Sequence, residues 1–201
     1  MPKLSEEKKS ERRDYILDIA FELFAEKGYA STGMRDIMKA SNISKGGIYV
    51  YFNSKLEILL GIMQRIDSKR RNILKDIDSS LSADQILSQY LERRLEIFKY
   101  PKNHKWAKIS LMFWSLPKDI PELKEIDDER YKAYRADIEH IINQGIMEGV
   151  FRASYNVDSM VYQIMSTING VGVLSGVMGR VITDTQIKDI VDMHLKYLKG
   201  E

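Results

Sequence analysis

The sequence predicts an all-α protein in which a small N-terminal domain of three helices precedes a larger helical domain. Apolar residues recur at helical spacing along almost the whole chain, and no stretch shows a convincing strand pattern. Capping residues, glycines and prolines separate the periodic runs. With 201 residues, 44% of them apolar and 30% charged, the chain has the composition of a soluble globular protein. We place the domain boundary at residue 55, which gives domains of residues 1–55 and 56–201.

The composition excludes several classes of protein. The longest apolar stretch, Ile164 to Ile182, contains four glycines and Arg180, so it lacks the roughly 20 uninterrupted apolar residues of a membrane span. The first fifteen residues are dense in charge and have no apolar core, which is the opposite of a signal peptide. Because the chain has no cysteine, it has neither disulfides nor a cysteine-bound zinc. We expect a cytoplasmic protein that does not associate with membranes.

The small excess of positive charge lies in the N-terminal domain. Residues 1–55 hold ten Lys/Arg and eight Asp/Glu (10 − 8 = +2), while the rest of the chain holds 21 of each (21 − 21 = 0). Within residues 31–55, Asp36 is the acidic residue among four basic ones, namely Arg35, Lys39, Lys45 and Lys55. Such a patch is either a solvated surface or the electrostatic footprint of a polyanion partner.

Three helices are expected in the N-terminal domain. The first has one apolar face, formed by Ile16, Ile19, Ala20, Leu23 and Phe24, and it ends at Gly28. Thr32 is the expected N-cap of a short helix over Gly33 to Ala40, and residues 41–43 form a turn. Ser44 then caps a second short helix over Lys45 to Tyr51. A capping box from Ser54 to Glu57 starts a longer fourth helix.

The two short helices have the spacing of a helix-turn-helix, in which the second helix enters the major groove of DNA. That helix opens with Ser44, Lys45, Gly46 and Gly47, so backbone N–H groups and a lysine face a polyanion with little side-chain bulk. Each glycine costs a helix about 1 kcal/mol relative to alanine, so we attribute both to close approach to DNA. Tyr49 lies on the polar side, because Ile48 and Phe52 are needed for packing against the first helix.

A longer pattern between Ile16 and Leu59 carries a family resemblance. It comprises Ala20, Leu23, Phe24, Gly28, Tyr29, Thr32, Arg35, Asp36, Ile37, Ile43, Ser44, Lys45, Gly46, Tyr49, Tyr51, Phe52 and Lys55. This pattern resembles the DNA-binding domain of the tetracycline-repressor-like (TetR/AcrR) transcriptional regulators. Two positions depart from it: Met38 stands where alanine is commonest, and Asn42 where glycine is commonest. Asparagine tolerates a left-handed backbone, so we expect the turn to survive.

The resemblance implies a homodimeric regulator that binds a double-stranded DNA operator through its N-terminal domain. By position, Thr32 and Lys55 would clasp phosphates, and Ser44, Lys45, Gly47 and Tyr49 would face the groove, with Gly46 permitting approach. Arg35 completes the expected DNA-binding set. Val50 either contacts a thymine methyl group or packs in a partly buried position.

The C-terminal domain is expected to bind a small hydrophobic effector. Capping boxes at Ser82–Gln85 and Thr183–Gln186 and the prolines predict helices over about 82–99, 104–116, 120–148 and 184–198, with Gly149 ending the third. Large, adaptable apolar side chains suit a concave binding site, although each alone is also typical of an ordinary core. The expected pocket residues are Trp106, Phe113, Trp114, Tyr134, Met147, Phe151, Tyr162 and Met165.

The end of the chain is expected to form the dimer interface. Gly172 and Gly176 permit close approach of another helix, and Ile187, Val191 and Leu195 form an apolar stripe on the helix that follows. Two such helices from each subunit would assemble a four-helix interface across a two-fold axis. The alternative is that these residues pack within one subunit.

The sequence does not favour an enzyme. It contains no phosphate-binding glycine loop and no nucleophile motif, and His104, His140 and His194 have no partner at metal-binding spacing. We therefore expect no metal and no cofactor, and we predict a ligand-responsive repressor that an effector releases from its operator. The alternatives are an activator or ligand-independent regulator of the same family, and an all-helical enzyme that uses the apolar pocket.

Overall fold

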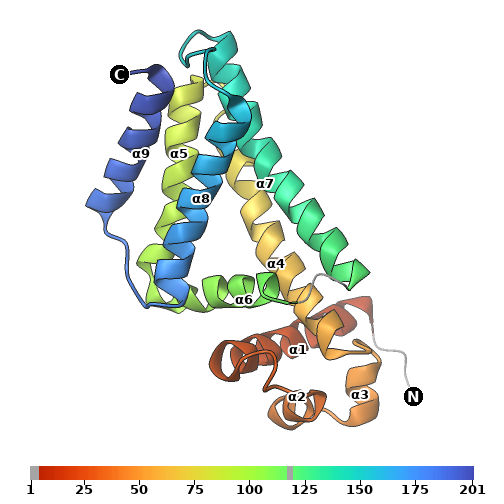
Figure 1. Cartoon of the computed structure of the whole chain (residues 1–201). Coiled ribbons are helices and arrows are strands. Elements are labelled where there is room, and N and C mark those ends of the chain that lie inside the picture. The colour runs from red at the N-terminus through yellow and green to blue at the C-terminus, as the bar shows by residue number, and fades with distance from the viewer. Residues whose placement is uncertain (1–4, 117–119) are drawn as a thin grey trace. The chain divides into compact units, whose positions relative to one another are not determined.

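The computed structural model describes residues 5–116 and 120–201, and this part of the chain is helical without any strand (Figure 1). The all-α prediction is therefore confirmed. The helices are α1 (Glu6–Lys27), α2 (Met34–Ser41), α3 (Lys45–Tyr49), α4 (Lys55–Lys75), α5 (Ala83–Glu96), α6 (His104–Trp114), α7 (Pro121–Met147), α8 (Val157–Gly176) and α9 (Asp184–Lys199), with short 3-10 helices at Ile97–Lys99 and Pro101–Asn103. None of the helices in the described ranges is long and apolar enough to cross a membrane.

The chain divides into two compact units. The N-terminal unit contains residues 1–67 together with 109–115, and the C-terminal unit contains residues 68–108 and 116–201. Helices α4 and α6 each run through both units, because each is cut by a boundary between them. The predicted division of roles at residue 55 stays a prediction.

The core of the N-terminal unit forms where the apolar periodicity placed it. Ile16, Ala20 and Phe24 on α1 are fully buried, as are Ile48 and Phe52 from the region of α3. Burial of an isoleucine or phenylalanine side chain stabilises a fold by about 1.5–3 kcal/mol. Gly28 ends α1 with a positive φ of 86°, and its N–H donates to the carbonyl oxygen of Phe24. The predicted first helix and its end are confirmed.

The start of α2 differs from the prediction. Gly33, not Thr32, is the N-cap, and its N–H donates to Oδ2 of Asp36 at 2.7 Å. Thr32 is fully buried, and its hydroxyl donates to the carbonyl oxygen of Gly28 at 2.8 Å. The threonine therefore closes the loop that follows α1, which leaves its side chain unable to cap α2. Asn42 has φ of 53° at the end of α2, so the expected left-handed asparagine is confirmed.

The C-terminal unit is built around α5. Helix α5 packs against α7, α8 and α9 (Figure 1), and their inward faces form one apolar core. Its fully buried members include Leu87, Tyr90, Leu91, Leu95 and Ile141. The predicted capping box at the start of α9 is confirmed by both bonds between Thr183 and Gln186, with N to O distances of 2.9 and 3.2 Å.

Ion pairs connect several segments of the C-terminal unit. Lys199 at the end of α9 donates to Asp84 at the start of α5, with an Nζ to Oδ2 distance of 2.6 Å. This bond and one from the Ser82 hydroxyl lower the pKa of Asp84 below its ordinary value. Lys99 pairs with Asp184, and Arg135 of α7 pairs with Asp158 of α8. Each of these pairs joins two segments that surround the apolar core.

Candidate functional site

Helices α2 and α3, with the turn between them, form the predicted helix-turn-helix. The side chain of Ser44 accepts from the N–H of Gly47 at 3.2 Å, so the predicted cap of α3 is confirmed. Helix α3 ends at Tyr49, two residues earlier than predicted. Lys45 is exposed and its Nζ lies 6.0 Å from the centre of the Tyr49 ring, which is itself 40% exposed. Helix α3 thus presents a lysine at its start and a tyrosine at its end to solvent.

The two glycines of α3 have different surroundings. A methyl group at Gly46 would meet no atom within 4 Å, so this face of the helix is open. A methyl group at Gly47 would lie 2.7 Å from Cγ2 of Ile43 and 3.3 Å from the hydroxyl of Ser44. The structure therefore gives Gly47 a packing reason of its own, which the sequence interpretation missed. Close approach to DNA remains the reason we infer for Gly46.

Val50 follows α3 and is 74% exposed, so the alternative that it packs in a partly buried position is wrong. Arg35 and Lys39 on α2 are also exposed. Together with Lys45 they place positive charge on the helix-turn-helix, as the charge count indicated. Contact of these side chains with DNA stays a prediction.

Lys55, expected at a phosphate, is held inside the N-terminal unit. Its Nζ donates to the carbonyl oxygen of Tyr29 at 2.7 Å and lies 4.1 Å from the centre of the Tyr29 ring. The N–H of Tyr29 in turn lies 3.2 Å from Sδ of Met112 on α6. Burial raises the pKa of the Tyr29 hydroxyl above its ordinary value. Lys55 and Thr32 therefore both brace the loop between α1 and α2, and their expected phosphate contacts stay predictions.

A groove beside the helix-turn-helix contains residues that the sequence interpretation did not select. Its volume is about 470 Å³, and it is lined by Lys8, Glu11, Arg12, Tyr15 and Tyr51. Arg12 lies 5.8 Å from the centre of the Tyr15 ring, and the Tyr15 hydroxyl donates to the carbonyl oxygen of Ser41 at 3.4 Å. The signal was present in the sequence as basic residues in the first turns of α1, but periodicity gave no reason to bring them beside Tyr51.

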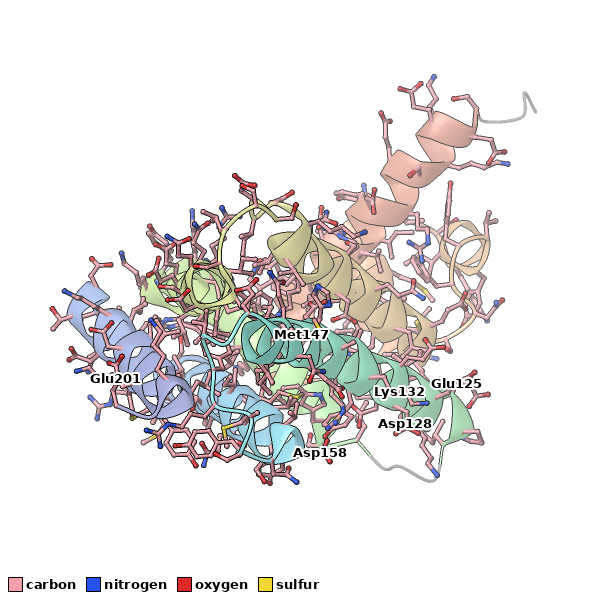
Figure 2. All side chains as sticks on the ribbon, turned by 90° about the horizontal axis from the view of Figure 1, so that it is seen from above. Glu125, Asp128, Lys132, Met147, Asp158 and Glu201 are labelled. Carbon is pink, nitrogen blue, oxygen red and sulfur yellow. The ribbon has the colours of Figure 1, made fainter. Side chains whose placement is uncertain are left out.

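The eight expected pocket residues are distributed over both units. Phe113 is fully buried in the N-terminal unit, which also contains Trp114, whereas the other six belong to the C-terminal unit. Met147, at the end of α7 (Figure 2), is 82% exposed and Tyr162 is 68% exposed. Phe151 is buried, and its ring fills the space above Gly145, where a methyl group would lie 2.1 Å from the ring. Trp106 and Met165 are half-buried.

Tyr134, another expected pocket residue, lies in a polar cluster on the facing sides of α5 and α7. Its hydroxyl lies 3.2 Å from Nη1 of Arg70, and the guanidinium of Arg94 lies 4.8 Å from the centre of its ring. Burial raises the pKa of the nearby Tyr90 to about 12. Burial also raises the pKa of the Asp137 carboxyl group above its ordinary value. We call Arg70, Tyr90, Arg94, Tyr134 and Asp137 the Arg94 cluster; sequence patterns pointed to Tyr134 alone among them.

The residues expected at the dimer interface face inward to a large extent. A methyl group at Gly176 would lie 2.7 Å from Cβ of Ala107, and one at Gly172 would lie 3.3 Å from the ring of Phe98. Ile187 and Val191 are buried in the core of the C-terminal unit, while Leu195 is half-buried. The close approach that the glycines permit is therefore used within the chain, as the alternative interpretation held.

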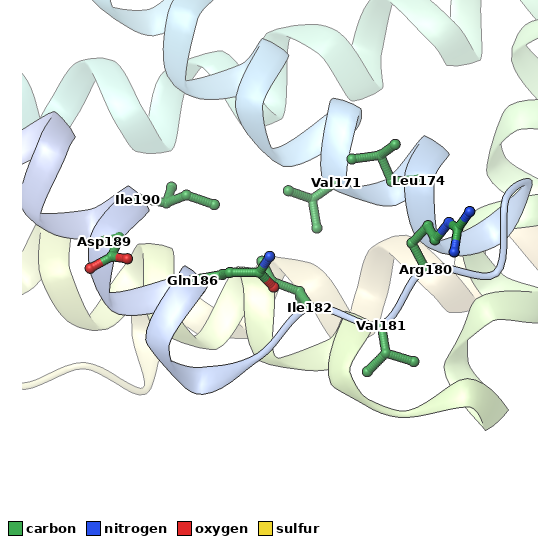
Figure 3. A pocket seen from close by; sticks show the side chains of 8 residues that line it. All are labelled: Val171, Leu174, Arg180, Val181, Ile182, Gln186, Asp189 and Ile190. Atoms are coloured by element: carbon green, nitrogen blue, oxygen red, sulfur yellow. The ribbon is translucent and has the colours of Figure 1, made fainter.

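An exposed apolar surface nevertheless covers the outward side of α8 and the segment that follows it. Its exposed residues include Tyr162, Val173, Leu174, Val177, Met178 and Val181. A groove of about 290 Å³ lies between the end of α8, the connecting segment and α9 (Figure 3). Leu174 and Val181 line this groove, together with Arg180 and Asp189. In the described residues no group of three or more His, Asp and Glu side chains is placed to hold a metal ion.

Comparison with known proteins identifies the family. Residues 16–62 match the family model described as bacterial regulatory proteins, tetR family. The chain is 30% identical over 166 residues to the HTH-type transcriptional repressor KstR2 of Mycobacterium tuberculosis, a match that covers 81% of this chain and 80% of that protein. It is 29% identical over 126 residues to the uncharacterised HTH-type transcriptional regulator YerO of Bacillus subtilis, which covers 61% of this chain and 42% of that protein.

A solved structure shares the fold. The transcriptional regulator FadR from Bacillus subtilis, in complex with stearoyl-CoA, superposes with a TM-score of 0.71 at 21% identity over 92% of this chain and 97% of that chain. The family model matches the part of the chain that holds the helix-turn-helix, and the match to KstR2 covers four fifths of both chains. Members of this family are transcriptional regulators that bind DNA and are not enzymes. The chain therefore belongs to the TetR family of DNA-binding transcriptional regulators.

Proposed function

We propose that this chain is a homodimeric, ligand-responsive repressor that leaves its operator when a small hydrophobic effector binds to the C-terminal unit. The observation that carries the DNA-binding part is the open end of α3. Exposed Lys45 begins this helix and exposed Tyr49 ends it, and a methyl group at Gly46 would meet no atom within 4 Å. A helix N-terminus with free approach suits contact with phosphates and base edges in the major groove.

The proposed dimer uses the outward side of α8 and α9. Val173 of α8 lies one turn before Val177, the residue that follows this helix, Met193 and Tyr197 are one turn apart on α9, and all four are exposed. Apolar side chains grouped in this way mark a protein interface when they are contiguous. A second copy that packs the same surface against itself would form an isologous two-fold interface. This assignment replaces the inward-facing glycines as the surface that meets the partner.

The proposed coupling runs along the two helices that pass through both units. Effector binding to the C-terminal unit would favour a conformation in which α4 moves and the two recognition helices of the dimer no longer match successive major grooves. A coupling of about 1–3 kcal/mol would weaken operator binding about 5- to 150-fold. Two relatives support this proposal: KstR2 is a repressor by name, and FadR has been solved with stearoyl-CoA bound.

Fluorescence anisotropy tests the DNA-binding part. The protein is titrated against DNA from upstream of its own gene at two salt concentrations, beside Tyr49→Ala. We expect saturable binding that resists competitor DNA, weakens with salt because phosphate contacts are screened, and is lost in the variant. Light scattering coupled to size exclusion measures the dimer, and Val177→Glu should give a monomer. Binding no tighter than to random DNA, or an operator affinity unchanged by an effector bound tightly to the protein, would contradict the proposal.

A further inference from the structure

Arg94 is an arginine in the interior of the C-terminal unit. It is only 6% exposed, and it lies on α5 between the buried apolar residues Leu91 and Leu95. Its Nε and Nη1 atoms are buried without a hydrogen-bond acceptor among the residues that the structure describes. Buried donors of this kind are rare in folded proteins, and a charged donor is the costliest kind to leave without an acceptor. These two donors of Arg94 are therefore left for a further acceptor.

The charges around Arg94 favour an anion as that acceptor. Arg70 donates to the hydroxyl of Tyr134, and the Arg94 guanidinium lies over the ring of the same tyrosine. Arg94 and Lys75 both act electrostatically on Asp137. Asp137 is half-buried and supplies one carboxylate to Arg94 and Lys75. His140 also acts electrostatically on Asp137. An incoming anionic group would balance the excess of positive charge in this group of residues.

The surroundings of the cluster are apolar. Leu87 and Leu91 on α5 and Ile138 and Ile141 on α7 are buried within one core, to which α8 contributes Met160 and Ile164. A small inorganic anion has no apolar part that could pack against such side chains. A molecule with an anionic group and a long apolar chain would satisfy Arg94 and pack against the same core.

We propose that Arg94 binds the anionic group of an amphiphilic effector, with the ring of Tyr134 and the Arg70 side chain positioning its guanidinium. This inference rests on the proposed function, since it names the chemical class of the effector that the C-terminal unit takes. The anionic group is the carboxylate of a free long-chain acid or the phosphate of its coenzyme A thioester. Both present negative oxygens, for which the planar guanidinium of arginine is suited.

Isothermal titration calorimetry on the full chain without DNA tests the inference. The probes are straight-chain carboxylates of 8 to 18 carbons, the coenzyme A thioesters of the same acids, and alcohols of the same lengths as uncharged controls. Wild type is compared with Arg94→Met, which removes the charge at similar side-chain length, and with Arg94→Lys, which keeps it. Arg93→Met is the matched control, because Arg93 lies next in the chain but donates to the carbonyl oxygen of Asp76 at 3.1 Å.

We expect one anionic series to bind wild type at least about tenfold more tightly than the alcohols, because an arginine donor is then paired with an anion. Arg94→Met should abolish that preference and Arg93→Met should keep it. The series that loses its preference in Arg94→Met identifies the source of the anion. Arg94→Met should itself fold, since replacing a buried charge by an apolar side chain is often neutral or stabilising; should it fail to fold, weakened anion binding by Arg94→Lys gives the same answer.

Three results would overturn the inference: alcohols that bind as tightly as the anionic probes, a preference that survives in folded Arg94→Met, or no binding of either anionic series at any length. The operator assay is run separately with the same compounds. If an anionic probe binds through Arg94 and leaves operator affinity unchanged, the proposed effector response fails while the anion site stands. If an uncharged compound binds and releases DNA, the effector response stands and the role of Arg94 fails.

Discussion

The two adjacent glycines of α3 allow a matched pair of substitutions that separates DNA contact from stability. Gly46→Ala adds a methyl group where no atom lies within 4 Å. Gly47→Ala adds a methyl group 2.7 Å from Cγ2 of Ile43, a residue that is only 6% exposed. The two variants therefore make the same chemical change in the same helix, and only their surroundings differ.

The structure sets the expected magnitudes. Alanine is favoured over glycine in a helix by up to about 1 kcal/mol, so Gly46→Ala should be as stable as wild type or slightly more stable. Overpacking of a buried site costs about 1–3 kcal/mol, so Gly47→Ala should lose up to about 2 kcal/mol after the same helix gain is subtracted. For operator affinity, Gly46→Ala is the variant that we expect to be impaired. Gly46→Ala should bind at least about tenfold more weakly, a loss of about 1.4 kcal/mol, because its methyl group stands between α3 and the DNA.

Urea unfolding followed by circular dichroism gives the stabilities, and fluorescence anisotropy gives the affinities at a single salt concentration. The operator is the fragment that wild type binds in the presence of competitor DNA. An affinity of Gly46→Ala equal to that of wild type would place Gly46 outside the DNA interface. Equal stabilities of the two variants would mean that Ile43 adjusts to the added methyl group at no cost, and the packing reason for Gly47 would be refuted.

Three further predictions concern His194, Gly176 and Asn42. Burial lowers the pKa of His194, whose Nε2 lies 3.1 Å from the Thr167 hydroxyl. Wild type should therefore lose stability as pH falls below about 6.5 toward the lowered pKa, and His194→Gln should lose less stability. Urea midpoints measured at pH 7.5 and 5.5 check this, and equal losses in the two proteins would contradict it. Gly176→Ala would put a methyl group 2.8 Å from the Lys108 backbone nitrogen and should cost about 1–3 kcal/mol of stability in thermal unfolding. The control Gly170→Ala, whose methyl group would meet no atom within 4 Å, should not destabilise the protein. Equal stabilities of the two variants would contradict this prediction. Asn42→Ala should cost about 1–2 kcal/mol because Asn42 has φ of 53°, while Asn42→Gly should be near neutral, and a stable Asn42→Ala would show that the turn can change its backbone.

The sequence was sufficient to predict features that depend on residues close together along the chain. The apolar face of α1, the Ser44 cap and the left-handed turn at Asn42 each follow from spacings of a few residues. The capping box of α9 is of the same kind. Local hydrogen-bond geometry and helical period determine these features, so a single chain contains the information. The wrong prediction for Thr32 shows the limit of such local information. Its hydroxyl donates to the carbonyl oxygen of Gly28 across a loop, and helical periodicity does not describe that loop.

Features that depend on the partner of a helix face could not be predicted in the same way. The small residues of α8 correctly indicated a close approach, but the approaching atoms of Gly176 belong to Ala107 of the same chain and not to a second subunit. Likewise, an apolar stripe on α9 indicated a buried surface without telling whether the chain or its partner buries it. Helical periodicity identifies which face avoids water, whereas the identity of the neighbour is decided by tertiary packing.

Arg94 shows the same limit for a charged residue, and with a functional consequence. In a helical pattern an arginine is normally assigned to the solvent side, since charged side chains are almost never fully buried unless they are paired. Here the flanking residues Leu91 and Leu95 are both fully buried, and the guanidinium enters the core with them. A methionine at this position would fill similar space without the cost of removing a charge from water. The apolar core thus gives no reason for an arginine, and the proposed binding of an anion supplies one.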